Sequence, residues 1–306
     1  MALGGYLQGE VTKDFADGLL SRREALRRLV LLGMAAPAAG ALLAACGGDD
    51  GDAGADATTS PPPTEAPTTS ARPPSTSGAA TGQGELIRFP GTNAELQGAW
   101  AAPEDPTASV LVIHENRGLT PHFYDLVGRF AADGYAALAV DLLSREGGTA
   151  SFADPAAAPA ALGAAPVDRL LADLRAGLDE QNRRNPGLAL AAVGFCFGGG
   201  MAWNLLDAGE ARLAAVVPFY GPAPQNPDFG DADAAVLGVY AELDDRVNAS
   251  RAAAEQALAA AGLTYEIRTF PGVDHAFFND TGPRYDEQAA TEAYAAVLDW
   301  FDQHLG

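Results

Sequence analysis

The sequence predicts a single α/β domain over residues 85–306, with a mostly parallel central sheet and helices on both faces. Two observations predict this fold class. Short apolar runs rich in Val, Leu and Ala alternate with longer segments of helical periodicity, as in parallel strands that crossover helices bury on both faces. No internal repeat and no second break in composition divides this part of the chain. One doubly wound domain is therefore the economical architecture.

The strands are expected where the apolar runs are short. The first two runs, at residues 86–89 and 96–101, lie close together and predict an edge hairpin. Longer helical patterns separate the later runs, which predicts parallel strands joined by crossovers. These six strands are expected at residues 109–114, 135–140, 188–194, 213–220, 235–241 and 265–270.

The helices are expected where apolar residues recur at spacings of three and four. Each such segment falls between two predicted strands or after the last one. The predicted helices cover residues 121–133, 167–181, 198–207, 247–261 and 286–304. Residues 144–165 are rich in Ala, Gly and Pro, so we expect an irregular loop there.

Residues 1–46 have the plan of an export signal. Arg22-Arg23 resembles the twin-arginine address, and Leu43-Ala44-Ala45-Cys46 resembles the lipobox of bacterial lipoproteins. We expect cleavage before Cys46, lipidation of that cysteine and a location in the cell envelope, on the extracytoplasmic side of the membrane. The alternative is an uncleaved anchor, although the apolar run from Leu29 to Ala45 contains Pro37 and is short against the ~20 residues of a spanning helix.

Residues 47–84 are Gly, Asp, Thr, Ser, Pro and Ala with almost no large apolar side chain. Such a segment cannot offset the entropy lost on ordering, so we expect a disordered tether between the anchor and the domain. The two cysteines, Cys46 and Cys196, lie in segments of different character, and no disulfide between them is expected.

The formal net charge of −21 argues against nucleic-acid binding, because it repels phosphate backbones. Nucleotide motifs are also excluded around the glycines near Cys196. Cys196 stands where a dinucleotide fingerprint needs its second glycine, and no lysine follows as a phosphate loop requires. We expect no cofactor and no metal.

Gly194-Phe195-Cys196-Phe197-Gly198 follows a predicted strand and begins a predicted helix. In this context a nucleophile elbow exposes its central side chain at the top of a sheet. The flanking glycines fit, because the sharp turn leaves no room for a Cβ atom two residues away on either side. The alternative is that Cys196 is a small buried hydrophobic residue, as most unpaired cysteines are.

A hydrolase with such an elbow supplies its acid and then its histidine later in the chain, each after a strand. The first later strand of this kind ends in Glu242, Asp244 and Asp245, and the next strand ends before His275. The carboxylate that orients the imidazole has to face inward. The residues alone do not choose among the three.

Several segments together resemble the dienelactone hydrolase family. They are the cysteine elbow, Asp244 three residues before Val247, Asp274-His275-Ala276-Phe277, and His114-Glu115-Asn116-Arg117-Gly118. The resemblance covers residues 85–306 and implies the α/β-hydrolase fold in one catalytic domain. It also implies a triad of Cys196, Asp244 and His275.

The same resemblance implies roles for residues outside the triad. Glu115 would lie beside Cys196 and keep the thiol protonated until substrate displaces the carboxylate, although the residues alone fit a surface cap equally well. The backbone N–H groups of Phe197 and Asn116 would form the oxyanion hole. Family members that act on dienelactone bind its carboxylate with arginines, and the candidates here are Arg117, Arg145 and Arg284.

The expected activity is attack by the Cys196 thiolate on the carbonyl of a small lactone or activated ester, followed by hydrolysis of the thioester. Two alternatives remain. One is a broader carboxylesterase or thioesterase that uses the same site. The other is a surface lipoprotein that binds a small ligand on this fold without catalysis.

Overall fold

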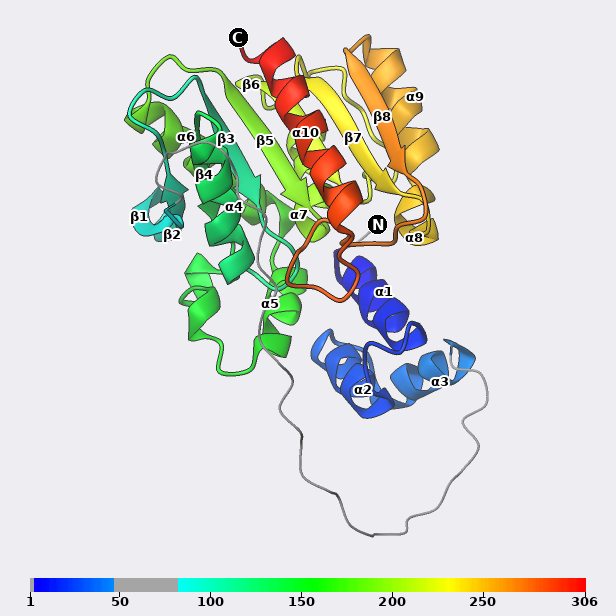
Figure 1. Cartoon of the computed structure of the whole chain (residues 1–306). Coiled ribbons are helices and arrows are strands. Elements are labelled where there is room, and N and C mark those ends of the chain that lie inside the picture. Colours follow the sequence, from blue (N-terminus) through cyan, green and yellow to red (C-terminus); the bar gives the residue numbers. More distant parts are fainter. Residues whose placement is uncertain (1–2, 47–81) are drawn as a thin grey trace, which may run out of the picture.

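The computed structural model describes residues 3–46 and 82–306 (Figure 1). An eight-stranded sheet in the order β1-β2-β4-β3-β5-β6-β7-β8 forms its centre. β1 and β2 form an antiparallel edge hairpin, β2 pairs antiparallel with β4, and the other pairs are parallel. The strands are β1 (Glu85–Gly91), β2 (Ala94–Ala101), β3 (Ala108–Ile113), β4 (Tyr135–Val140), β5 (Leu190–Phe195), β6 (Leu213–Phe219), β7 (Ala235–Ala241) and β8 (Tyr265–Phe270). The predicted fold class and the edge hairpin are confirmed.

Helices cover both faces of the sheet. α4 (Pro121–Ala132) and α10 (Glu287–His304) lie on one face, where the rings of Phe130 and Phe301 are 6.2 Å apart. α6 (Val167–Arg184) and α7 (Phe197–Asp207) lie on the other face, and α8 (Asp245–Asn248) and α9 (Arg251–Ala261) follow β7. Every residue of β3, β4 and β5 is buried, as expected for strands covered on both faces.

Two sequence predictions need correction in detail. Residues 144–165 are not wholly irregular: they contain three short 3₁₀ turns and helix α5 (Ala158–Ala164), because Leu162 packs into the core and gives the segment a buried side. The predicted helix at 247–261 is two helices. Its first turn begins earlier, since the Asp244 side chain accepts from the Val247 N–H, and Ser250 ends that turn by donating to the Val247 carbonyl.

The first residues form a three-helix bundle of α1 (Leu3–Ala16), α2 (Arg22–Leu31) and α3 (Ala36–Cys46). A small apolar core holds the bundle together, and its buried members are Val11, Ala25, Leu29, Ala39 and Leu43. The bundle lies beyond the carboxyl ends of the parallel strands, with α1 nearest the sheet (Figure 1). Leu7 of α1 joins the main core.

A turn between α2 and α3 interrupts the apolar run in which the sequence predicted a signal segment. Within residues 3–46 and 82–306, no helix combines the length and apolar character needed to cross a membrane. The export signal, its cleavage and the lipidation of Cys46 stay predictions. The predicted tether lies almost wholly outside the described residues, since only residues 82–84 of it are described.

Candidate active site

Cys196 lies at the turn between β5 and α7, with φ 56° and ψ −116°. A positive φ is rare for a residue with a side chain and is stored strain typical of functional sites. The flanking positions have no room for a side chain, as the sequence predicts. A Cβ on Gly194 would lie 2.0 Å from the Gly198 carbonyl oxygen, and one on Gly198 would lie 2.2 Å from the Ile113 carbonyl oxygen. The local geometry is that of a nucleophile elbow.

His275 and Asp244 come together from the loops after β8 and β7. The Nδ1 atom of His275 lies 2.5 Å from Oδ2 of Asp244, and both side chains are buried. Glu242 instead accepts from the Gly272 N–H, and Asp245 is exposed. Of the three carboxylates left open by the residues, the fold therefore brings Asp244 to the imidazole.

Cys196 Sγ lies within 4.8 Å of a ring nitrogen of His275. Nε2 of His275 has no aligned hydrogen-bond partner in the described part of the chain. Catalytic hydrogen bonds are often long before substrate binds. The fold thus places the thiol, imidazole and carboxylate in the order that nucleophilic catalysis needs.

The electrostatic surroundings of this pair are unusual. Burial raises the pKa of the Cys196 thiol, the nearby Glu10 carboxylate raises it further, and His275 opposes both. Burial works against a charged His275, but Glu10, Cys196 and the hydrogen bond to Asp244 outweigh it and raise the pKa of this imidazole well above its usual value. The thiol is therefore held protonated and the imidazole charged.

Glu115 is buried just after the end of β3, and it lies near the thiol without a hydrogen bond to it. Its carboxylate accepts from the Asn279 amide at 2.8 Å and from the Tyr220 hydroxyl at 3.4 Å. Among the described residues, the carboxylate that accepts from the Cys196 thiol is that of Glu10, at 3.8 Å, and not that of Glu115. Glu115 acts on Cys196 as a nearby charge that raises the thiol pKa.

The two predicted oxyanion donors come from the elbow itself and from the loop after β3. Phe197 is the first residue of α7, so its N–H is among those with no partner inside the helix. Asn116 is half-buried in the loop after β3 and lines a cavity of about 300 Å³ together with Arg117, Glu10 and Asp14. This loop therefore borders the space beside α1.

His114 holds this loop rather than taking part in the triad. Its Nδ1 lies 2.7 Å from the Glu115 carbonyl oxygen, and its Nε2 accepts from the Leu142 N–H at 3.1 Å. These two bonds define one neutral tautomer, and burial lowers the pKa of this histidine. His114 thereby holds in place the start of the loop that carries Glu115.

The three predicted substrate arginines have different positions. Arg145 lies away from the thiol, because it pairs with buried Asp173 and donates to the Thr92 carbonyl. Arg117 is exposed at the cavity beside α1. Arg284 lies close to the triad, with Nε 3.8 Å from Oδ2 of Asp274, the residue before His275.

Sequence reasoning missed three side chains that surround the thiol. Tyr6 Oη lies 3.4 Å from Cys196 Sγ, Glu10 Oε1 lies 3.3 Å from His275 Nε2, and the Arg246 guanidinium bonds to Glu10. The Arg246 guanidinium also lies 4.6 Å from the centre of the Tyr6 ring. Tyr6 and Glu10 were missed because they fall within the predicted export signal. Arg246 was missed because its spacing from Asp244 does not indicate a role in the site.

Glu10, Cys196 and His275 offer ligand atoms within 4.8 Å of one another, a donor set that suits a divalent cation such as Zn²⁺. However, the Arg246 guanidinium already bonds to Glu10 and brings a positive charge to the same place. A cation would therefore have to displace Arg246 from that carboxylate.

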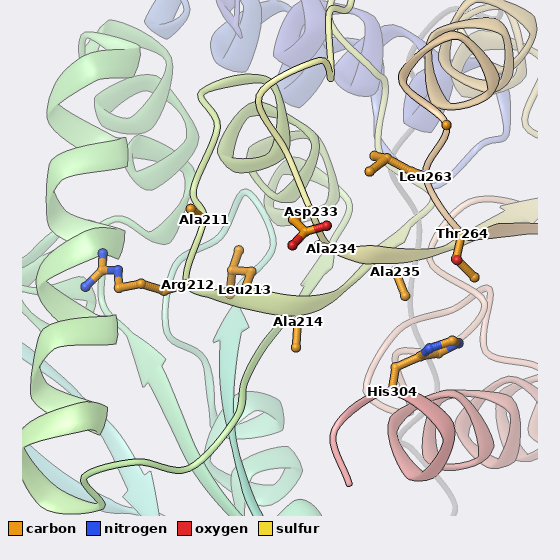
Figure 2. Close-up of a pocket in the computed structure, with 11 residues that line it drawn as sticks. Ala211, Arg212, Leu213, Ala214, Asp233, Ala234, Ala235, Leu263, Thr264 and His304 are labelled. Atoms are coloured by element: carbon orange, nitrogen blue, oxygen red, sulfur yellow. The ribbon is translucent and has the colours of Figure 1, made fainter.

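A larger cavity of about 450 Å³ lies at the opposite edge of the sheet (Figure 2). It opens where β6, β7 and β8 begin, between Arg212, Asp233 and His304. None of the site residues named above lines it. Ligands in open α/β folds bind at the carboxyl ends of the strands, so this cavity is not the catalytic one.

The comparisons with known proteins agree with this geometry. A candidate carboxymethylenebutenolidase of Escherichia coli O157:H7 is 34% identical over 66% of this chain and 79% of its own length. One of Saccharolobus solfataricus is 30% identical over 69% of this chain and 95% of its own. The crystal structure of a candidate dienelactone hydrolase from Klebsiella pneumoniae, 29% identical, matches with a TM-score of 0.64 over 72% of this chain and 98% of its own.

The sequence profile of the dienelactone hydrolase family matches residues 96–305, which is most of the domain built on the sheet. The fold, the elbow and these relatives point the same way. The chain belongs to the dienelactone hydrolase family.

Proposed function

We propose that this protein hydrolyses a small lactone or activated ester with Cys196 as the nucleophile, His275 as the general base and acid, and Asp244 as the residue that orients His275. The observation that carries the proposal is the contact between His275 Nδ1 and Asp244 Oδ2 next to a cysteine at a strained elbow. Membership of the dienelactone hydrolase family supports it.

The steps follow from this arrangement. In its neutral form His275 takes the thiol proton at Nε2 as the Cys196 sulfur attacks the carbonyl carbon, and the resulting oxyanion accepts from the N–H groups of Phe197 and Asn116. The tetrahedral intermediate collapses to a thioester, and His275 returns its proton to the departing alkoxide or enolate. Water, deprotonated by His275, then attacks the thioester and releases the acid and the thiol.

The chemistry of the nucleophile limits the substrate class. A thiolate attacks readily but is itself a good leaving group, so the intermediate expels the sulfur unless the other group leaves easily. Strained lactones and activated esters meet this condition better than amides or plain triglycerides. A broader carboxylesterase or thioesterase would use the same residues, and a panel of p-nitrophenyl esters and lactones ranks these substrates.

The decisive experiment is mass spectrometry of the Cys196 peptide after incubation with a panel of lactones and esters and an acid quench. An acyl adduct on Cys196, together with loss of turnover in Cys196→Ala, is the expected result. Cys196 is buried in this structure, but an adduct still accumulates if the site opens for a small fraction of the time. Turnover retained in Cys196→Ala contradicts the assignment, and it would then favour the non-catalytic role for this thiol.

We further propose that the mature protein is anchored to the extracytoplasmic side of a membrane by lipid on Cys46. The motif Leu43-Ala44-Ala45-Cys46 and the pair Arg22-Arg23 support this. Cys46→Ala is expected to release the protein from the membrane fraction without changing its turnover. Unchanged membrane fractionation of that variant would contradict the lipid anchor.

A further inference from the structure

We propose that α1 is an intramolecular plug that holds the active site closed. The inference rests on the proposed function, because it takes Cys196 as the nucleophile. The plug docks at the mouth of the site, where Arg246 and Arg284 pair with its acidic residues.

The first observation is that α1 covers the reacting atoms. Cys196 and His275 are only 3% and 2% exposed, although the elbow of this fold presents its nucleophile at the top of the sheet. Tyr6 and Leu7 of α1 are themselves buried, and Tyr6 Oη lies 3.4 Å from Cys196 Sγ. Since an attacked carbonyl carbon has to come within ~3–3.5 Å of the sulfur, Tyr6 fills the space that substrate needs.

The second observation is the charge of the helix face that does this. Glu10 and Asp14 are four residues apart, which places them on one side of α1, and Asp17 follows directly after its last residue. Glu10 bonds to Arg246. Asp14 lies 2.9 Å and Asp17 lies 2.6 Å from the two terminal nitrogens of Arg284.

A basic residue of α1 completes the match. Lys13 Nζ lies 2.7 Å from Oδ2 of Asp274, the residue next to His275. The contact joins opposite charges and lies at the same mouth as the two guanidinium groups. The face of α1 is thus complementary to the mouth in charge.

Without α1, both guanidinium groups lose their short ion pairs. Arg246 keeps Asp244 at 3.8 Å, and Arg284 keeps Asp274 at 3.8 Å. Among the described residues, the shortest ion pairs of both guanidinium groups are thus those made to α1 and to the residue that follows it.

The position of the plug in the chain suggests how it is removed. All of α1 and α2, and α3 up to Ala45, lie before the bond at which the proposed cleavage would occur. One cut before Cys46 would therefore separate the whole plug from the catalytic domain. Proteolytic removal of a covering segment is a known way to release an enzyme from a latent state.

The test measures access to the thiol, not turnover. Full-length protein and the double variant Tyr6→Ala/Glu10→Ala are alkylated with iodoacetamide over a series of pH values. The limiting rate at high pH is read on the Cys196 peptide by mass spectrometry, so that a lower thiol pKa without the Glu10 charge does not count as opening. Because the rate scales with the open fraction, the variant is expected to react about tenfold faster or more. Thr12→Ala is the matched control and should leave the rate unchanged, since among the described residues the Thr12 hydroxyl bonds within α1, to the Gln8 carbonyl.

A second arm removes the plug without changing any residue that touches the site. A protease sequence placed within residues 47–81 allows the folded, purified chain to be cut and then diluted. Faster alkylation of Cys196 on dilution is expected as the helices dissociate. Equal rates for the double variant, the cut protein at every dilution and the intact chain, with melting curves showing a folded domain, would overturn the plug.

Fast alkylation of the opened protein with no turnover on the panel of esters and lactones would contradict the proposed hydrolysis and leave the plug standing.

Discussion

Nδ1 of His275 lies 2.5 Å from Oδ2 of Asp244, across two loops that are 31 residues apart in the chain. The contact fixes the ring and leaves Nε2 pointing to the side of the thiol. It also lowers the pKa of the Asp244 carboxyl against the opposing effect of burial. The carboxylate therefore stays ionised at neutral pH, where it can stabilise a charged imidazole.

We expect Asp244→Asn to lower kcat by ~10³–10⁴-fold, because an amide favours the wrong imidazole tautomer and cannot balance the imidazolium charge. The measurement is the rate of hydrolysis of a p-nitrophenyl ester by the Asp244→Asn variant and by the unaltered protein under the same conditions. Asp245→Asn is the matched control, since Asp245 is adjacent and exposed, and its kcat should be unchanged. A loss of less than threefold in Asp244→Asn would remove this carboxylate from the mechanism.

Gly198→Ala is expected to destabilise the domain by about 3 kcal/mol or more, because its Cβ would lie 2.2 Å from a backbone oxygen that cannot move aside. Gly200→Ala, in the same helix, places a Cβ at an ordinary 3.5 Å from Pro222 and should stabilise by up to ~1 kcal/mol through helix propensity. Urea melts of both variants give the two free energies of unfolding. Similar stabilities would contradict the close approach at the elbow.

The alkylation rate of Cys196 is expected to rise with pH through a midpoint above the usual thiol pKa of ~8.5. Burial raises the pKa of this thiol and the Glu10 charge raises it further, so the reactive thiolate is scarce near neutral pH. Removing the charge in Glu10→Gln should move the midpoint to lower pH. The pH profile of iodoacetamide labelling measures it, and a midpoint that moves upward in this variant would refute the role of Glu10.

Arg145→Ala should cost about 3 kcal/mol of stability, because it leaves the buried carboxylate of Asp173 without its partner. Its effect on kcat should be small, since the pair lies away from the thiol. Arg88→Ala is the control: Arg88 and Glu95 form an exposed pair, whose loss costs less than ~0.5 kcal/mol. A large rise in KM for Arg145→Ala with unchanged stability would restore it as a substrate-binding residue.

Much of the fold follows from the sequence, because the alternation of apolar runs and helical periods is a local signal. The elbow is legible for the same reason, since Gly194 and Gly198 report a steric need within five residues. Asp244 and His275 can be ordered along the chain, but that Asp244 rather than Asp245 faces inward depends on how the turn before α8 is capped.

The part of the site that could not be predicted is the part built from distant segments. Glu10 and Cys196 are 186 residues apart, and no local pattern relates them. The composition of residues 1–46 favours an export signal, which hid the acidic face of α1 from notice. The position of the Arg145 side chain could not be predicted for the same reason. It depends on Asp173, which the packing of α6 brings to the guanidinium.

Arg22 and Arg23 are exposed at the start of α2, on the same bundle whose first helix covers Cys196. A receptor that recognises paired arginines would therefore bind them on a folded chain whose active site is still covered by α1. Oxidants attack thiolates that solvent can reach, and this thiol is neither ionised nor accessible in that state. The sulfur would thus cross into an oxidising compartment in its reduced form.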